Sequence, residues 1–182
     1  LAGDQVVADP LYGLNIQAKA RTTNADDYSV SVTGYQTEVK TLADGTAVEL
    51  QKPLYSFKGA VPELYSVRQA PQVIGMGLLE AIPEQAILAN VDINDANGDG
   101  VKGVAHWVQN PETGATQLGR FGWKAGQPTL NQQNAEAFAN DMGLTSSLVS
   151  QDNCTEAQLD CRHAPHGGEP EVSDNILASV LF

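Results

Sequence analysis

Hydrophobic and polar residues alternate along the stretch YSVSVTGYQTEV, which covers residues 28–39. A two-residue period that is rich in valine, threonine and tyrosine is typical of a β-strand. A second stretch of this kind covers residues 46–50, and the Asp44-Gly45 pair between the two is a favoured hairpin turn. The pattern therefore predicts that residues 28–39 and 46–50 pair as antiparallel strands.

A second hairpin and a longer helix are predicted farther along the chain. The stretches GVAHWVQ and TQLGRFGWKA flank the turn sequence PETG, which indicates two more antiparallel strands. The stretch TLNQQNAEAFANDMG has helical spacing; Thr129 or Asn131 can cap its start, and Gly143 can end it. The apolar stripe of this helix has three predicted members, which are Ala135, Phe138 and Met142.

The remaining segments are less regular. A short helix is predicted to open at Pro83, with Glu84 favourable at its N-terminal dipole, and a final helix at Ser173 or Asp174. Residues 61–83 are apolar but are interrupted by glycine and proline, which indicates a closely packed connection, and residues 1–25 have no period. We expect an α+β fold with antiparallel hairpins, a few short helices and irregular Gly/Pro-rich connections, in one domain that covers residues 1–182.

Composition narrows the function classes. A hydrophobic content of 42% indicates a folded domain with a core. The net charge of −12 disfavours nucleic acid and anionic lipid as partners, and no run of about 18 apolar residues predicts a membrane span. The chain opens on LAGDQ without a methionine or a signal peptide and ends on NILASVLF, so we expect it to be a piece of a longer protein.

The stretch CTEAQLDCRHAPHGG contains both cysteines and two of the three histidines. Covalent haem attachment uses C-x-x-C-H, and this stretch lacks that spacing. Cys154, Cys161, His163 and His166 are residue types that zinc accepts. A Cys154–Cys161 disulfide would close a short loop and contribute about 2.5 kcal/mol, and two free thiols are the remaining alternative.

A turn-rich stretch resembles the first half of a calcium-binding loop. Asp95, Asn97 and Asp99 supply oxygen atoms at positions 1, 3 and 5, glycine occupies position 6, and the Val101 carbonyl stands at position 7. The closing glutamate is missing, because position 12 is His106, and another acid would have to replace it. The alternative is a polar turn in which the side chains bond their own backbone.

Acid–base chemistry and anion binding have candidates in the glycine-rich segments. Glu80 lies in the apolar stretch GMGLLEAIP, where a carboxylate could act as a general acid or base or could bond nearby backbone amides. Four basic or indole side chains stand beside glycine or proline turns and could hold a buried carboxylate or propionate, or could pair with the many acids of the chain: Arg68, Arg120, Trp123 and Lys124. Met76 and Met142 could be axial ligands to iron or core residues.

Taken together, several strings resemble the di-haem oxidoreductase family, which is related to bacterial di-haem cytochrome c peroxidases and whose members are often labelled thiol oxidoreductases. They are DPLYG, SVRQAPQVIGMGLLEAIPEQAIL, DANGDGVKG, LGRFGWKAGQPTLNQQNAEAFANDMG and the cysteine loop. The resemblance covers about residues 9–161. Family members carry C-x-x-C-H haem sites, and this sequence has none, so it resembles the part between two such motifs.

The resemblance implies a periplasmic parent protein with two haem c groups, peroxidase-like electron transfer and an unknown electron-transfer partner. It also implies that Glu80 acts in a distal pocket, that Arg68, Arg120, Trp123 or Lys124 hold propionates, and that a disulfide suits an exported protein. The rival hypothesis is a calcium-stabilised, disulfide-bonded extracytoplasmic binding domain without catalysis.

Overall fold

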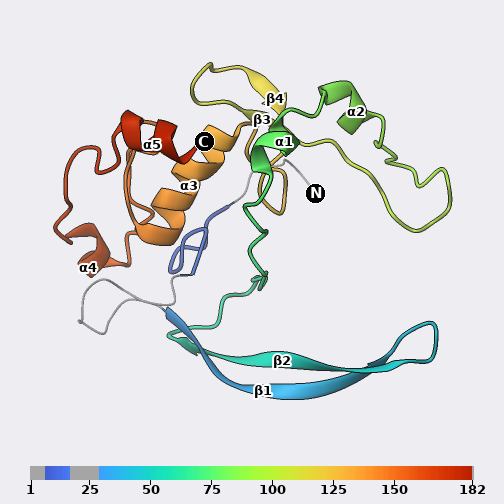
Figure 1. Cartoon of the computed structure of the whole chain (residues 1–182). Coiled ribbons are helices and arrows are strands. Elements are labelled where there is room, and N and C mark those ends of the chain that lie inside the picture. The colour runs from blue at the N-terminus through green and yellow to red at the C-terminus, as the bar shows by residue number, and fades with distance from the viewer. Residues whose placement is uncertain (1–6, 17–28, 182) are drawn as a thin grey trace. The chain divides into compact units, whose positions relative to one another are not determined.

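Two separate antiparallel hairpins and several short helices make up the described part of the chain, which comprises residues 7–16 and 29–181 of a computed structural model (Figure 1). The elements follow in the order β1 (Ser29–Thr41), β2 (Ala47–Lys58), α1 (Met76–Glu80), α2 (Glu84–Leu88), β3 (Trp107–Gln109), β4 (Thr116–Leu118), α3 (Leu130–Met142), α4 (Leu159–Arg162) and α5 (Asp174–Val180). The predicted α+β class is confirmed.

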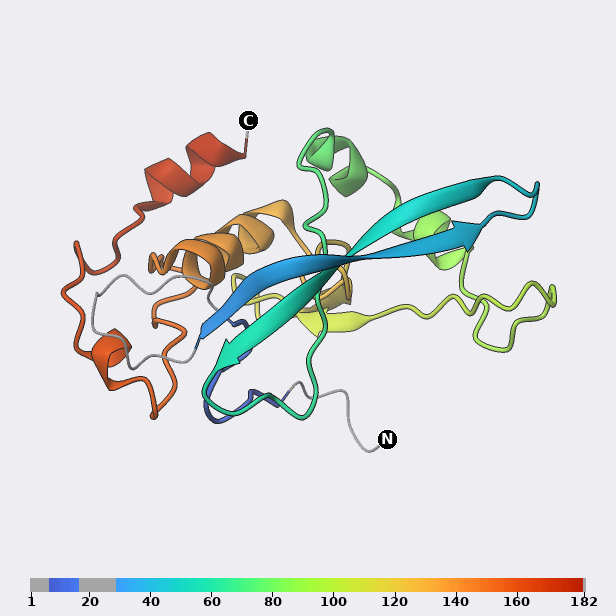
Figure 2. The same ribbon diagram turned by 90° about the horizontal axis from the view of Figure 1, so that it is seen from below.

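Strands β1 and β2 form the long hairpin that the alternation predicts. The register runs from Ser29 opposite Lys58 to Thr41 opposite Ala47, with an irregularity between Val32 and Gly34. Seen from below in Figure 2, the two strands twist around each other, as L-amino-acid strands do. Strand β2 is longer than predicted, and the predicted first strand residue, Tyr28, lies outside the described residues.

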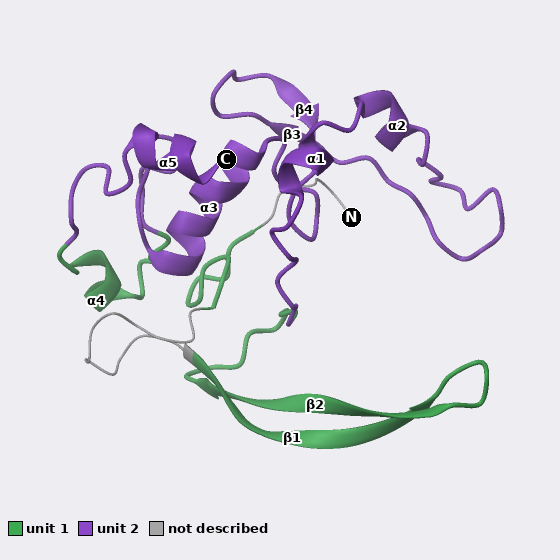
Figure 3. Ribbon diagram, viewed as in Figure 1, with its two compact units in different colours: residues 1–66, 153–165 green, residues 67–152, 166–182 purple. Residues whose placement is uncertain are grey.

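The chain divides into two compact units, which Figure 3 shows in different colours. Unit 1 comprises residues 1–66 and 153–165, and unit 2 comprises residues 67–152 and 166–182. We describe each unit by itself, and the expectation of one domain stays a prediction.

In unit 1, the DPLYG stretch forms a tight turn against the base of the long hairpin. One Asp9 carboxylate oxygen accepts from the backbone N–H groups of Leu11 and Tyr12, at 2.8 and 3.0 Å. The buried Tyr12 hydroxyl donates to the backbone carbonyls of Lys58 and Ala60, at 3.1 and 2.6 Å. The DPLYG stretch, which lacks hydrophobic periodicity, is therefore held by hydrogen bonds from its polar side chains.

The Cys154–Cys161 disulfide also belongs to unit 1, with 5.8 Å between the two Cα atoms. Because the two sulfur atoms are bonded to each other, neither is a thiolate ligand or a free thiol. The disulfide prediction is confirmed, and the zinc and free-thiol interpretations are wrong. The short helix α4, which sequence periodicity does not reveal, includes Cys161.

The core of unit 2 lies between helices α3 and α5. Ala135, Val172 and Leu177 are buried together, and Phe138 and Leu144 pack against them. The predicted caps of α3 are confirmed, since the Thr129 hydroxyl accepts from the Gln132 N–H and Gly143 ends the helix in a left-handed conformation. A helix opens at Ser173 as predicted.

The predicted apolar stripe of α3 is wrong at Met142, which is 56% exposed. The reason is the turn after the helix: the Leu144 N–H returns to the Phe138 carbonyl, and the Leu144 side chain packs on the core. The helix buries four residues, which are Leu130, Gln132, Ala135 and Ala139.

We predict that replacing Asp44 with alanine destabilises the long hairpin in a pH-dependent way. The Asp44 Oδ1 atom accepts from the Thr46 N–H at 2.9 Å, and this hydrogen bond holds the pKa of Asp44 below its usual range. A depressed folded-state pKa means that the contribution is present above the unfolded-state pKa of about 3.9 and is lost as the pH falls through the folded-state pKa.

The melting temperatures of the wild type and of Asp44→Ala should therefore differ most above the unfolded-state pKa of about 3.9 and converge as the pH falls through the folded-state pKa. Asp44→Asn is the matched control, because it keeps an oxygen acceptor without a charge. A difference that is the same at every pH would show that the carboxylate charge has no part in the turn.

Candidate functional site

Glu80, the last residue of α1, is fixed by a backbone amide of another helix. Its Oε1 atom accepts from the Leu130 N–H, the first amide of α3, at 2.8 Å. Helix α3 has no acidic residue in its own first turn, so Glu80 supplies the negative charge that an N-terminal dipole favours. The side chain is exposed, and its Oε2 atom makes no hydrogen bond to the described residues. The contact to a backbone amide is the alternative that the sequence left open, and the acid–base role stays a prediction.

Arg120 holds the backbone on either side of the α1 C-terminus. Its Nη1 atom donates to the Glu80 carbonyl at 3.2 Å and to the Ile82 carbonyl at 2.6 Å. Two carbonyls that share one guanidinium nitrogen cannot move apart without losing a charge-assisted hydrogen bond. Arg120 therefore fixes the turn that follows Glu80.

The loop that carries Arg120 has little freedom to move. A Cβ atom added at Gly119 would lie 1.8 Å from the Ala125 carbonyl oxygen, so only glycine fits there. Phe121 is buried, and its backbone pairs with that of Gln127 in a short bridge. The motif LGRFGWKAG is thus a rigid turn whose glycine lets the backbone close on itself.

Trp123 ties the same loop to the segment before α1. Its indole Nε1 atom donates to the Gln69 carbonyl at 2.7 Å, while the side chain stays 61% exposed. The contacts of Trp123 and Arg120 fall on backbone carbonyls at both ends of the Gly/Pro-rich connection. The sequence reveals neither acceptor, because every residue has a carbonyl.

The cations near this loop form no ion pair within the described residues. Arg68 and Lys124 are exposed and each is next in sequence to a partner of the Trp123–Gln69 hydrogen bond. The salt bridges in the described ranges are Lys40–Glu38, Lys52–Glu38 and His166–Glu169. The chain carries 22 acidic residues, but Arg68, Arg120 and Lys124 form no ion pair with those that the structure describes, and the alternative of pairing with acids stays a prediction.

Apolar side chains remain exposed on the segment that these contacts hold. Neither α1 nor α2 buries a residue. Val73, Ile74 and Leu78 are 82%, 84% and 78% exposed, and Leu79 and Ile82 are also exposed. The described part of unit 2 therefore offers hydrophobic side chains, two unpaired cations and one oriented carboxylate on residues that hydrogen bonds link.

The two methionines are placed differently with respect to Glu80. Met76 begins α1, four residues before Glu80, and is half-buried. Met142 ends α3, and the helix rise separates it from the Leu130 amide by about 18 Å. The structure thus brings Met76, but not Met142, to the Glu80 end of α3, and axial ligation by either stays a prediction.

The Asp/Asn loop forms the polar turn that was the alternative to a calcium site. Asp95 accepts from the Gly100 N–H at 3.1 Å, Asn97 from the Asp99 N–H at 3.1 Å, and Asp99 from the Val101 N–H at 2.8 Å. Asp92 accepts from the Ala96 N–H at 2.8 Å. Calcium binding by this loop stays a prediction.

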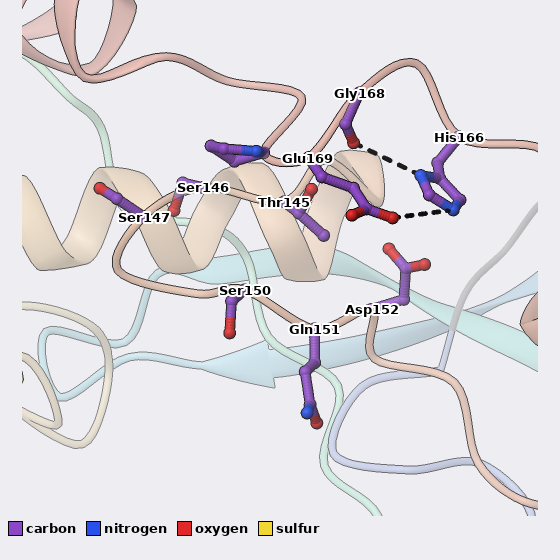
Figure 4. Close-up of a pocket in the computed structure, with 10 residues that line it drawn as sticks. Thr145, Ser146, Ser147, Ser150, Gln151, Asp152, His166, Gly168 and Glu169 are labelled. Atoms are coloured by element: carbon purple, nitrogen blue, oxygen red, sulfur yellow. Dashed lines mark hydrogen bonds and ion pairs between the residues drawn. The ribbon is translucent and has the colours of Figure 1, made fainter.

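A cavity of about 520 Å³ lies in unit 2, between residues 145–152 and 166–170 (Figure 4). The His166 Nδ1 atom lies 3.4 Å from the Gly168 carbonyl oxygen, and Nε2 lies 3.8 Å from a Glu169 carboxylate oxygen. Figure 4 shows the Asp152 carboxylate at the same end of the cavity. Throughout residues 7–16 and 29–181, no three His, Cys, Asp or Glu side chains are grouped to hold a metal ion.

Comparison with known proteins identifies one family. Residues 64–166, more than half of the chain, match the family described as di-haem oxidoreductase, putative peroxidase. The matched stretch contains Glu80, the 119–127 loop and the disulfide. No curated protein and no solved structure matches the chain.

Proposed function

Because the chain belongs to the di-haem oxidoreductase family, we propose that its α1 segment and its 119–127 loop line a haem pocket in which Glu80 moves protons during peroxide cleavage. The observation that carries this proposal is the combination of exposed apolar side chains, unpaired cations and an oriented carboxylate on one connected stretch of unit 2. The apolar side chains are costly to leave open to water, the cations Arg68 and Lys124 form no ion pair with the described residues, and Oε2 of the Glu80 carboxylate accepts no hydrogen bond from them.

The residues present suit a haem. A haem has a flat apolar ring and two propionate carboxylates. Ile74, Leu78 and Leu79 provide hydrophobic contact for a ring, and Arg68 and Lys124 can donate to carboxylates. No C-x-x-C-H motif occurs in these 182 residues, so in this proposal the haem is attached to other residues of the protein. Arg120 can add contacts through the N–H donors that its backbone hydrogen bonds leave free, whereas the single N–H donor of Trp123 already binds the Gln69 carbonyl.

The chemistry divides between cofactor and protein. A bound haem would supply the electrons for reducing a peroxide. Glu80 would take a proton from one peroxide oxygen at Oε2 and return it to the other oxygen, which leaves as water. Its Oε1 atom, which the Leu130 amide holds, would keep the carboxylate in one orientation during both transfers.

The proposal includes an extracytoplasmic location and an unidentified electron-transfer partner. The disulfide supports the location, since disulfides persist in oxidising compartments. The described residues include no helix with the length and hydrophobicity that a membrane span requires. The acidic net charge argues against nucleic acid as a partner.

We predict that Glu80→Gln in the full-length, haem-loaded protein lowers peroxidase turnover by about a hundredfold, the usual scale of general acid–base catalysis. Glutamine keeps an oxygen for the Leu130 N–H, so haem content and fold should not change. Glu84→Gln is the matched control, because Glu84 is exposed and its side chain makes no hydrogen bond or ion pair within the described ranges. Steady-state kinetics measure the effect, and equal turnover in wild type and Glu80→Gln would leave Glu80 only its helix-capping role.

We further predict that Arg68→Gln or Lys124→Gln lowers the reduction potential of a haem. A cation beside a haem would favour the reduced state by on the order of 1 kcal/mol, or about 40 mV for one electron. Spectroelectrochemical titration measures the potential, and Lys102→Gln serves as the control because Lys102 is an exposed cation of the same unit. If the reduction potential changes by the same amount in Arg68→Gln, Lys124→Gln and Lys102→Gln, then Arg68 and Lys124 do not lie beside the haem.

The second candidate function is a calcium-stabilised binding domain, and the oxygen-rich turn from Asp95 to Val101 favours it. We predict that Asp95, Asn97, Asp99 and the Val101 carbonyl bind calcium at about 2.3–2.6 Å, with water or another acid completing the shell. Calcium at a hundred times its dissociation constant should then stabilise the fold by about 2.7 kcal/mol. Melting curves with calcium or chelator measure this shift for the wild type, Asp95→Asn and the control Asp141→Asn. Identical curves with and without calcium would exclude the site.

A further inference from the structure

The segment that carries Glu80 cannot be held in place by its own helix. Helix α1 has five residues and buries none of them, and isolated helices of that length are unstable in water. Ile74, just before the helix, and Leu78, within it, expose most of their surface. Polar contacts from outside the segment must therefore set its position.

Four hydrogen bonds, made by the side chains of Arg120, Trp123 and Glu80, hold the segment, and each has one partner within residues 120–130. Arg120 binds the carbonyls of Glu80 and Ile82, Trp123 binds the carbonyl of Gln69, and the Leu130 amide binds the Glu80 carboxylate. They fasten the connection before, at and after α1. At Gln69 and Ile82 the hydrogen bonds end on backbone carbonyls, so they do not occupy the side chains of these two residues.

The side chain at position 120 must meet a strict geometric requirement. It must reach two carbonyl oxygens that are two residues apart, at 3.2 and 2.6 Å, from a loop that Gly119 and Phe121 fix. Arginine carries a rigid fork of N–H donors, whereas lysine is a single flexible point charge. Glutamine is shorter and has no charge.

We propose that Arg120 is a positioning residue for Glu80: by fixing the Glu80 and Ile82 carbonyls it sets where the Glu80 carboxylate stands relative to the peroxide. The inference rests on the proposed acid–base role of Glu80. Trp123 assists by fixing the other end of the segment at Gln69. Arg120 does not itself touch the peroxide in this proposal.

The first test is hydrogen exchange, which needs no catalysis. In Arg120→Gln, the amides of Leu79, Ala81 and Ile82 should exchange roughly fivefold faster or more, because the turn loses charge-assisted bonds. Arg120→Lys should give an intermediate rate. Arg162→Gln, a change of the same kind at an exposed arginine in unit 1, should leave these rates unchanged. Wild-type exchange rates in Arg120→Gln would overturn the proposal.

The second test is kinetic and uses the full-length, haem-loaded protein. Arg120→Gln should lower kcat at least tenfold with little change in KM, Arg120→Lys should restore part of the loss, and Arg120→Gln added to Glu80→Gln should cost little more than Glu80→Gln alone. Additive losses, or unchanged turnover in Arg120→Gln where Glu80→Gln is impaired, would overturn the positioning role. Full turnover in Glu80→Gln would instead refute the proposed function itself. Trp123→Phe, which removes the Nε1 donor and keeps an aromatic ring, provides the same comparison if Arg120→Gln does not fold.

Discussion

The Arg120 guanidinium holds the α1 segment in place by hydrogen bonds, whereas buried hydrophobic side chains hold the other helices of the unit 2 core together. Helix α3 packs on α5 through Ala135 and Leu177, whereas α1 buries none of its residues and keeps Leu78 and Leu79 exposed. One nitrogen that binds two carbonyls, together with the Leu130 amide on the Glu80 carboxylate, holds this segment by polar contacts. A segment held by its backbone can present its side chains to something else, and the family match makes haem the natural candidate.

Glu80 can serve both as a structural contact to α3 and as an acid–base group in this arrangement. One carboxylate oxygen caps α3, where the helix has no acid of its own, and the other is open. The two capacities are compatible, because an acid–base residue works best when its orientation is fixed. In the proposed function, the rigid turn at Gly119 and Phe121 would act on the chemistry only indirectly, because it fixes Arg120, which holds the Glu80 backbone.

Sequence patterns predicted the elements whose stability is local. The β1–β2 alternation, the Asp44-Gly45 turn, the Thr129 cap and the Gly143 terminus all act within a few residues, and the structure has each of them. Helix α1 was missed because Gly75 and Pro83 bound a segment of only a few residues that distant contacts hold. The residues of the candidate site were found by type, but their partners were not, since the acceptors at Gln69 and Ile82 are backbone carbonyls.

The most direct test of this account is the exchange rate of the Leu130 amide, measured by NMR in the wild type and in Glu80→Ala. The Glu80 carboxylate is the acceptor of that amide, whereas the Gln133 amide bonds the Thr129 carbonyl and serves as an internal reference. The account predicts that Leu130 exchanges at least about fivefold faster in Glu80→Ala while Gln133 does not change. Equal Leu130 exchange in the two proteins would contradict it, because Glu80 would then not be fixed at the start of α3.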